Sequence, residues 1–282
     1  MIKLSKYLVL VLLFMTSTII AQDFQGVATY KSKRKLDIKL DSTQMASGMA
    51  EQMMEMLKKQ FEKTHILTFN KTESIYKEDE QLESPNPAGM QVVMVSSGGS
   101  DVLYKNTKEN RFTNQNESYS KLFLIKDELE KHDWKLTGET KFIGDYKCFK
   151  ATKIREVEVV ESSISINGDN EPDEDEEREP VMKDVEVVAW YAPEIPVNNG
   201  PSNYHGLPGL ILEVNDGTTT TICSKIVLNP KKVVAIEEPK KGKEITQEKY
   251  DAIIDKKSKE MMERMRSNRR DDGENISIRI GG

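Results

Sequence analysis

The chain has 282 residues and a formal net charge of −6, with 37% hydrophobic and 31% charged residues. This length provides enough apolar material for one large domain or two small ones. The acidic balance argues against binding to the phosphate backbone of a nucleic acid as the main role.

The N-terminus has the features of a secretory signal peptide. Lys3 and Lys6 precede an apolar run at residues 7–15, which is too short for a permanent membrane span. Smaller residues follow, and we expect cleavage after Ala21, so that residues 1–21 are removed and the mature chain starts at Gln22. The alternative is an uncleaved anchor. Cleavage takes the formal charge from −6 to −8, and it leaves no stable transmembrane segment in a chain that we expect in the periplasm or outside the cell.

Hydrophobic periodicity predicts two helices among many short strands. The first helix spans residues 45–61, because Met45, Met49, Met53, Leu57 and Phe61 recur every four residues with polar residues between them. The second begins after the capping residue Thr246 and extends to about Arg266. Strands are predicted at residues 24–30, 66–69, 74–76, 102–105, 111–113, 121–125, 156–160, 185–190, 210–214, 219–228 and 232–236, with two more around a Gly144-Asp145 turn within 134–154.

This order lacks the strand–helix alternation of a parallel sheet. We therefore expect an α+β domain at residues 22–266. A single curved antiparallel sheet, similar to the half-barrel of periplasmic lipoprotein carriers, would have one or two amphipathic helices packed against it. Residues 167–180 carry eight carboxylates and almost no apolar side chain, which indicates a disordered hairpin tip. Residues 267–282 are expected to form a flexible tail.

One stretch of the sequence is a specific signature. Trp190-Tyr191 and Pro196 are followed by Gly200-Pro201 and then by Gly206-Leu207-Pro208-Gly209-Leu210-Ile211. These residues resemble the signature of the GLPGLI family of Gram-negative envelope proteins. The resemblance implies no settled activity and supplies no catalytic residues. It makes a TonB-linked outer-membrane system a partner class worth testing.

Two interpretations of the signature remain. Gly206, Pro208 and Gly209 frame a tight turn before a central strand, with Trp190 and Tyr191 packed nearby. Alternatively, the turn forms the lip of a ligand groove or a partner-binding surface. We favour the structural interpretation, because glycine and proline punctuate loops more often than they form sites.

Cys148 and Cys223 lie in strand-like segments of an exported chain, which permits a disulfide between them. The competing interpretation is two buried thiols. Neither cysteine belongs to a C-x-x-C pair, so redox catalysis and zinc binding are poorly supported.

The motifs of catalysis and of cofactor binding are absent from the sequence. His65, His132 and His205 form no helical metal pair, and there is no nucleophile elbow or phosphate-binding glycine loop. We therefore expect no enzymatic activity, no cofactor and no dedicated metal site. The leading hypothesis is an accessory protein that binds an apolar ligand or an envelope partner. The alternative is a metal-handling protein, with copper at the methionine clusters or calcium at the acidic segment.

Overall fold

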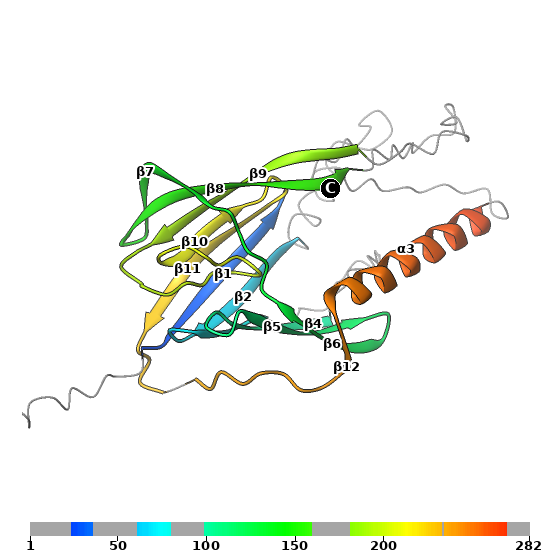
Figure 1. The fold of residues 1–282 in the computed structure, drawn as a ribbon, viewed down its shortest axis with the longest axis horizontal. Helices are drawn as coiled ribbons and strands as arrows, with labels where there is room; N and C mark the ends of the chain where they lie inside the picture. Colours follow the sequence, from blue (N-terminus) through cyan, green and yellow to red (C-terminus); the bar gives the residue numbers. More distant parts are fainter. Residues whose placement is uncertain (1–23, 36–60, 80–98, 160–180, 233, 270–282) are drawn as a thin grey trace, which may run out of the picture.

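The computed structural model describes residues 24–35, 61–79, 99–159, 181–232 and 234–269. Within these residues the chain forms one twelve-stranded sheet with β12 and β7 at its edges, and one helix, α3 (Figure 1). The strand order is β12-β6-β5-β4-β3-β2-β1-β11-β10-β9-β8-β7. Neighbouring strands are antiparallel except β12 and β6, which are parallel, so the sheet is mixed.

The first strands are β1 (Gly26–Arg34), β2 (Glu62–Phe69), β3 (Glu73–Glu78), β4 (Gly99–Asn106), β5 (Arg111–Ser118) and β6 (Lys121–Glu128). The later elements are β7 (Lys135–Ile143), β8 (Tyr146–Val159), β9 (Val181–Ala192), β10 (Leu210–Asn215), β11 (Thr219–Leu228), β12 (Lys243–Ile245) and α3 (Gln247–Arg269).

Turn chemistry identified several hairpins correctly. The turn between β2 and β3 is closed by Asn70, whose side-chain oxygen accepts hydrogen bonds from the backbone N–H groups of Thr72 and Glu73. The predicted Gly144-Asp145 turn joins β7 to β8, and Gly144 has a φ of 57°. The strands on either side of the acidic segment pair as expected, with Glu156 opposite Asp184. Residues 160–180 themselves lie outside the described residues.

The expected fold class needs correction, because the described chain is mostly β with a single helix and the sheet is not purely antiparallel. The predicted strand at residues 232–236 is also wrong, since residues 232 and 234–236 are not in a strand. They belong to a long connection that carries the chain from β11 to β12 at the far edge of the sheet (Figure 1). The predicted helix at 45–61 lies outside the described residues, apart from Phe61.

Helix α3 begins where the sequence predicted. The Tyr250 N–H donates to the carbonyl of Thr246, and the N–H of Gln247 in the first turn donates to the carboxylate of Asp127 on β6. Its N-terminal half packs through Tyr250, Ile253 and Ile254 against Phe123. The helix extends to Arg269, beyond the predicted end at Arg266. No helix among the described residues is long and apolar enough to cross a membrane.

The main core cluster joins the middle of the sheet to the connection between β9 and β10. It contains Tyr30, Leu67 and Phe69 from β1 and β2 together with Ile195 and Val197 from the connection, all at most 1% exposed. The two cysteines belong to the same cluster. Cys148 on β8 and Cys223 on β11 are free thiols, so this structure contains no disulfide between them. Burial raises the pKa of Cys148 to about 11 and that of Cys223 to about 12, which keeps both protonated at neutral pH.

Candidate functional site: the signature loop

Residues 193–209, between β9 and β10, form the signature loop. Burial alternates along it, because Ile195, Val197 and Leu207 are at most 2% exposed whereas Pro196, Gly206 and Pro208 are exposed. The loop runs beside the start of β10 and contributes hydrogen bonds that a neighbouring strand would otherwise make. The N–H of Leu210 donates to the carbonyl of Ile195, and the N–H of Ile211 donates to that of Asn199. The loop is therefore part of the sheet's packing.

Two glycines of the signature are required by geometry. Gly206 has a φ of 94°, a conformation that side-chain-bearing residues rarely adopt, and it lies against the ring of Trp134. A Cβ atom on Gly209 would lie 2.3 Å from the carbonyl oxygen of Ala192. Because that oxygen belongs to the backbone at the end of β9, the chain would have to move. These positions support the structural interpretation of the signature.

The two signature aromatics pack in different places. Tyr191 is buried in a second core cluster with Leu207 and Ile211. Trp190 is half-buried against the main cluster, with the ammonium of Lys141 4.4 Å from its ring centroid. The expectation that both aromatics pack beside the turn is thus confirmed for Tyr191. Gly200, Pro201, Leu207, Gly209, Leu210 and Ile211 are all buried.

A fully buried lysine holds the loop from the opposite part of the sheet. Lys105 on β4 is 0% exposed, and its Nζ donates to the carbonyls of Gly200 (2.8 Å), Ser202 (2.6 Å) and Tyr204 (3.3 Å). A protonated ammonium carries three N–H donors, which match these three acceptors. Burial lowers the pKa of Lys105 to about 7, and the three carbonyls oppose that shift by stabilising the charged form.

Two histidines share one acceptor at the tip of the loop. Nε2 of His132 lies 3.1 Å from the carbonyl oxygen of Asn203, and Nδ1 of His205 lies 3.0 Å from the same oxygen. A carbonyl only accepts, so each of these ring nitrogens carries a proton. The two rings have centroids 4.8 Å apart, and the indole of Trp134 donates to the carbonyl of His205 (2.8 Å).

A second lysine sets the protonation state of His132. Nζ of Lys153 lies 2.8 Å from Nδ1 of His132, which must therefore be the unprotonated acceptor. The side chains of His132 and Lys153 are 2% and 8% exposed. Glu130, with a 74% exposed side chain, places its carboxylate 3.7 Å from His132 and 3.8 Å from Lys153. Burial lowers the pKa of Lys153 and of His132, and it lowers the pKa of His205 to about 4.

Sequence reasoning identified the loop but missed the groups that hold it. Lys105 was predicted only as part of a strand, and no local signal marks it as buried. His132 and His205 are 73 positions apart in the chain, so their spacing carried no information. Trp134 and Lys153 were likewise not predicted as members of a cluster. Among the described residues, no group of three or more His, Cys, Asp or Glu side chains could hold a metal ion.

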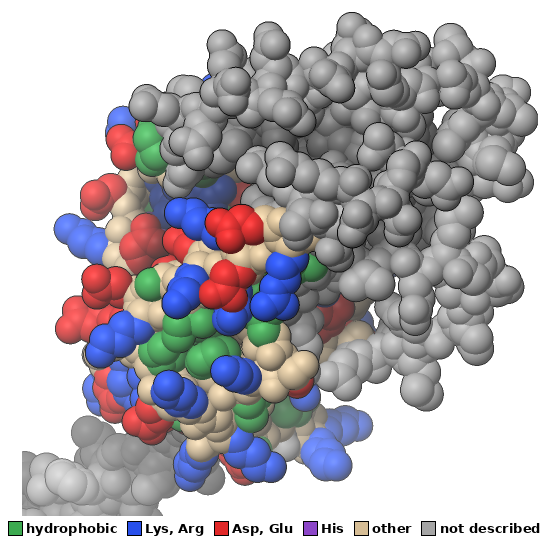
Figure 2. Space-filling model, turned by 90° about the vertical axis from the view of Figure 1, so that its right-hand side faces the viewer, with side chains coloured by type: hydrophobic (Ala, Val, Ile, Leu, Met, Phe, Trp, Pro, Cys, Tyr) green, Lys and Arg blue, Asp and Glu red, His purple; other side chains and the backbone are tan. Residues whose placement is uncertain are grey.

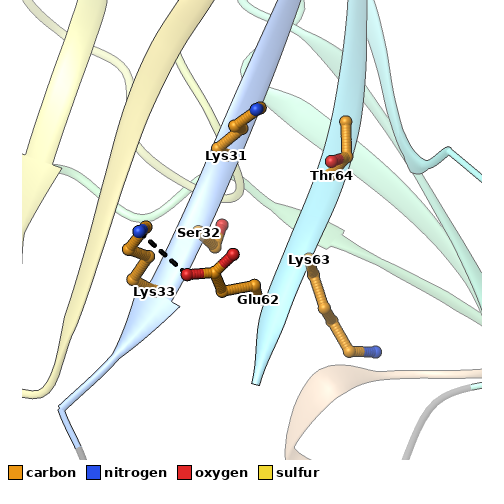
Figure 3. A pocket seen from close by; sticks show the side chains of 6 residues that line it. All are labelled: Lys31, Ser32, Lys33, Glu62, Lys63 and Thr64. Carbon is orange, nitrogen blue, oxygen red and sulfur yellow. Dashed lines mark ion pairs between the residues drawn. The ribbon is translucent and has the colours of Figure 1, made fainter. Parts of the chain in front are cut away.

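A separate shallow pocket lies between β1 and β2 (Figure 3). It has a volume of about 200 Å³ and is lined by Lys31, Ser32, Lys33, Glu62, Lys63 and Thr64. Lys33 pairs with Glu62 at 2.8 Å, and Lys63 pairs with Glu78 at 2.9 Å. Two of its three lysines are thus paired within the sheet, and we assign the pocket no ligand.

The signature loop lies inside a segment that matches a known family. Residues 134–213 match the family model described as "Protein of unknown function (Porph_ging)". In that segment, the chain is similar to a family of unknown function. No curated protein matches the chain.

Two solved structures of PNGF-II, in space groups C2 and P21, align with the chain at TM-scores of 0.46 and sequence identities of 15% and 14%. The alignments cover 82% of this chain and 32% and 33% of the PNGF-II chains, so this chain spans about a third of their length.

Proposed function

We propose that this chain is an exported accessory protein that binds an envelope partner and performs no chemistry of its own. The supporting observation is an exposed, partly apolar face on the β8–β9 hairpin. Directly opposite residues of an antiparallel pair share a face, so Ile154 and Glu186 lie together, as do Glu156 and Asp184. Met182 is on the same face, two residues before Asp184 along β9. Ile154 is 55% exposed and Met182 is 58% exposed.

The chemistry of this face indicates the partner. The three carboxylates of Glu156, Asp184 and Glu186 are exposed beside two large apolar side chains. A segment that carries both basic and apolar residues complements such a face. On the described part of the side shown in Figure 2, acidic and basic side chains are interspersed around a hydrophobic patch. The resemblance to GLPGLI proteins supports an envelope location, and a TonB-linked outer-membrane protein is the partner class that we would test first.

The alternative of an apolar ligand is less well supported. Ile195, Val197 and Leu207 of the signature loop are buried in the core clusters, so their apolar side chains are not free to contact a ligand. The metal-handling alternative depends largely on Met45, Met49, Met53 and residues 167–180, which lie outside the described residues. Metal analysis of the purified protein tests it directly, because stoichiometric copper or calcium would favour that alternative.

Changing Ile154→Ser together with Met182→Ser should abolish capture of the envelope partner. Photo-crosslinking in cells from position 186, opposite Ile154 on this face and unchanged in both variants, followed by mass spectrometry, identifies what contacts the face. The control is Val227→Ser, since Val227 is also exposed (38%) but lies on β11. Loss of the crosslinked partner in the double variant and its retention in the control are expected. Equal capture by both variants would rule out this face as the binding surface.

Export predicts that residues 1–21 are absent from the mature protein. N-terminal sequencing of the chain isolated from the envelope fraction should therefore start at Gln22. An intact Met1 in that fraction would contradict the cleavage, whereas recovery of the chain only from the cytoplasm would contradict the location as well.

A further inference from the structure

We propose that the signature loop is fastened by an acid-sensitive latch, in which the neutral pair His132–His205 holds the carbonyl of Asn203 and protonation of the pair releases it. The inference concerns regulation of the loop and does not depend on the identity of any partner. It rests on how donors and acceptors are matched around the two rings.

In the neutral state, each hydrogen bond of the latch joins a donor to an acceptor. His132 accepts from Lys153 through Nδ1 and donates to Asn203 through Nε2. His205 donates to the same carbonyl through Nδ1, and in the described part of the chain no hydrogen-bond partner is found for its Nε2. Trp134 donates to the backbone carbonyl of His205, which extends the network by one residue. The loop tip is therefore held from the β6–β7 connection.

Protonation breaks this matching. A proton on Nδ1 of His132 would put two donors and two positive charges in contact, because the ammonium of Lys153 is 2.8 Å away. A proton on Nε2 of His205 would add a charge to a residue that is only 8% exposed. The hydrogen bonds to Asn203 favour the charged rings and oppose opening. Repulsion from Lys153 and the cost of the buried charge act against these bonds, and they favour a rearrangement in which the rings leave the carbonyl of Asn203 and reach water.

Burial, the hydrogen bonds to Asn203 and the surrounding charges together set the pH at which this happens. Desolvation by burial is the largest cause and lowers the pKa of both histidines, whereas donation to the carbonyl of Asn203 raises both pKa values. Lys105 from β4 and Lys153 from β8 lower the pKa of His132, whereas Glu130 from the β6–β7 connection raises it. Lys105 and His132 also lower the pKa of His205, and Glu130 raises it. Tyr204 also faces the cluster, and Arg155 and Asp216 lie near that tyrosine. Cations thus outnumber anions around the pair, and desolvation adds to their effect.

The sign of the pH dependence follows. Free histidine titrates near pH 6.5, and both folded pKa values are lowered. The closed latch is therefore fully stable above about pH 6.5, and its stability is lost as the pH falls through the folded pKa values. At neutral pH the loop is closed, and acidification towards pH 4 opens it.

Trp134 reports the opening. The Trp190→Phe variant leaves Trp134 as the single tryptophan, since the chain has two. We expect its fluorescence emission to change as the pH falls from 7.5 to 4. Its ring centroid lies 5.8 Å from that of His132, and its indole N–H donates a hydrogen bond to the carbonyl of His205. Circular dichroism of the sheet should stay constant over this range. A constant Trp134 emission, or an emission change that coincides with loss of the sheet signal, would refute the latch.

Two substitutions in the Trp190→Phe background should move the pH midpoint of the Trp134 fluorescence change in opposite directions. Glu130→Gln removes an exposed anion without disturbing the core, and it should lower the midpoint by roughly 0.2–0.7 pH unit. Lys153→Met removes the cation that opposes protonation of His132, and it should raise the midpoint. Loss of a merely structural contact would not give opposite signs. Midpoints that stay unchanged, or that move in the same direction, would overturn the proposal.

Discussion

Gly209→Ala should lower the free energy of unfolding by about 3 kcal/mol or more. The added Cβ would lie 2.3 Å from the oxygen, 2.6 Å from the carbon of the Ala192 carbonyl and 2.8 Å from the nitrogen of Pro193. All three atoms belong to the backbone, so no side-chain rotation can relieve the overlap. The loop and the end of β9 would have to separate, which disturbs the hydrogen bond from Leu210 to Ile195. Equilibrium unfolding in urea measures the loss.

The matched control is Gly138→Ala on β7. No atom lies within 4 Å of a Cβ placed on Gly138, and its φ is not in the left-handed region. This change should leave stability unaltered or raise it by about 0.4–1 kcal/mol, because alanine restricts the unfolded chain. If Gly209→Ala unfolds at the same urea concentration as Gly138→Ala, close packing against Ala192 does not explain why the signature has a glycine at position 209.

Lys105→Met should destabilise the protein by about 3 kcal/mol, measured at pH 6, where the ammonium is charged. Methionine has a similar volume but no donor, so the carbonyls of Gly200 and Ser202, and more weakly that of Tyr204, would be left without a partner inside the core. Removing the charge also relieves its desolvation. We expect the lost hydrogen bonds to dominate, because the loop backbone cannot turn its carbonyls to water while Leu207 and Val197 stay buried.

Lys108→Met provides the control for this prediction. Lys108 lies three residues further along the chain in the exposed β4–β5 turn, and its substitution should change stability by less than about 0.5 kcal/mol. If Lys105→Met and Lys108→Met are equally stable, the hydrogen bonds of the Lys105 ammonium do not contribute to the free energy of unfolding.

Both predictions assign the signature to folding. Its glycines permit the close approach of the loop to β9, and its apolar residues join two core clusters. Binding, which we propose for this protein, would then fall to another surface, such as the exposed face of the β8–β9 hairpin that carries Ile154 and Met182. Met182 and Ile154, whose side chains are exposed there, lie outside a motif that is defined by the glycines of the loop.

Much of the local structure could be predicted from the sequence. Asn70 and Gly144 marked their turns, because they satisfy or bend the backbone within a few positions of themselves. Thr246 marked the start of α3, where its carbonyl accepts from the N–H of Tyr250. The parallel strand β12 could not be predicted, since three residues carry no periodicity. The sequence also left the state of Cys148 and Cys223 open, and the structure places them as buried thiols.

By itself, the sequence determined most of the strands, several of their turns and that the signature includes a tight glycine turn. Only the tertiary structure decided what that turn contacts. Lys105 reaches Gly200 across 95 positions of the chain, and His132 reaches Asn203 across 71. Periodicity assigns a residue to one face of its own strand, but it does not specify which distant loop covers that face. The curvature and order of the whole sheet determine that, and they arise from all of its pairings together.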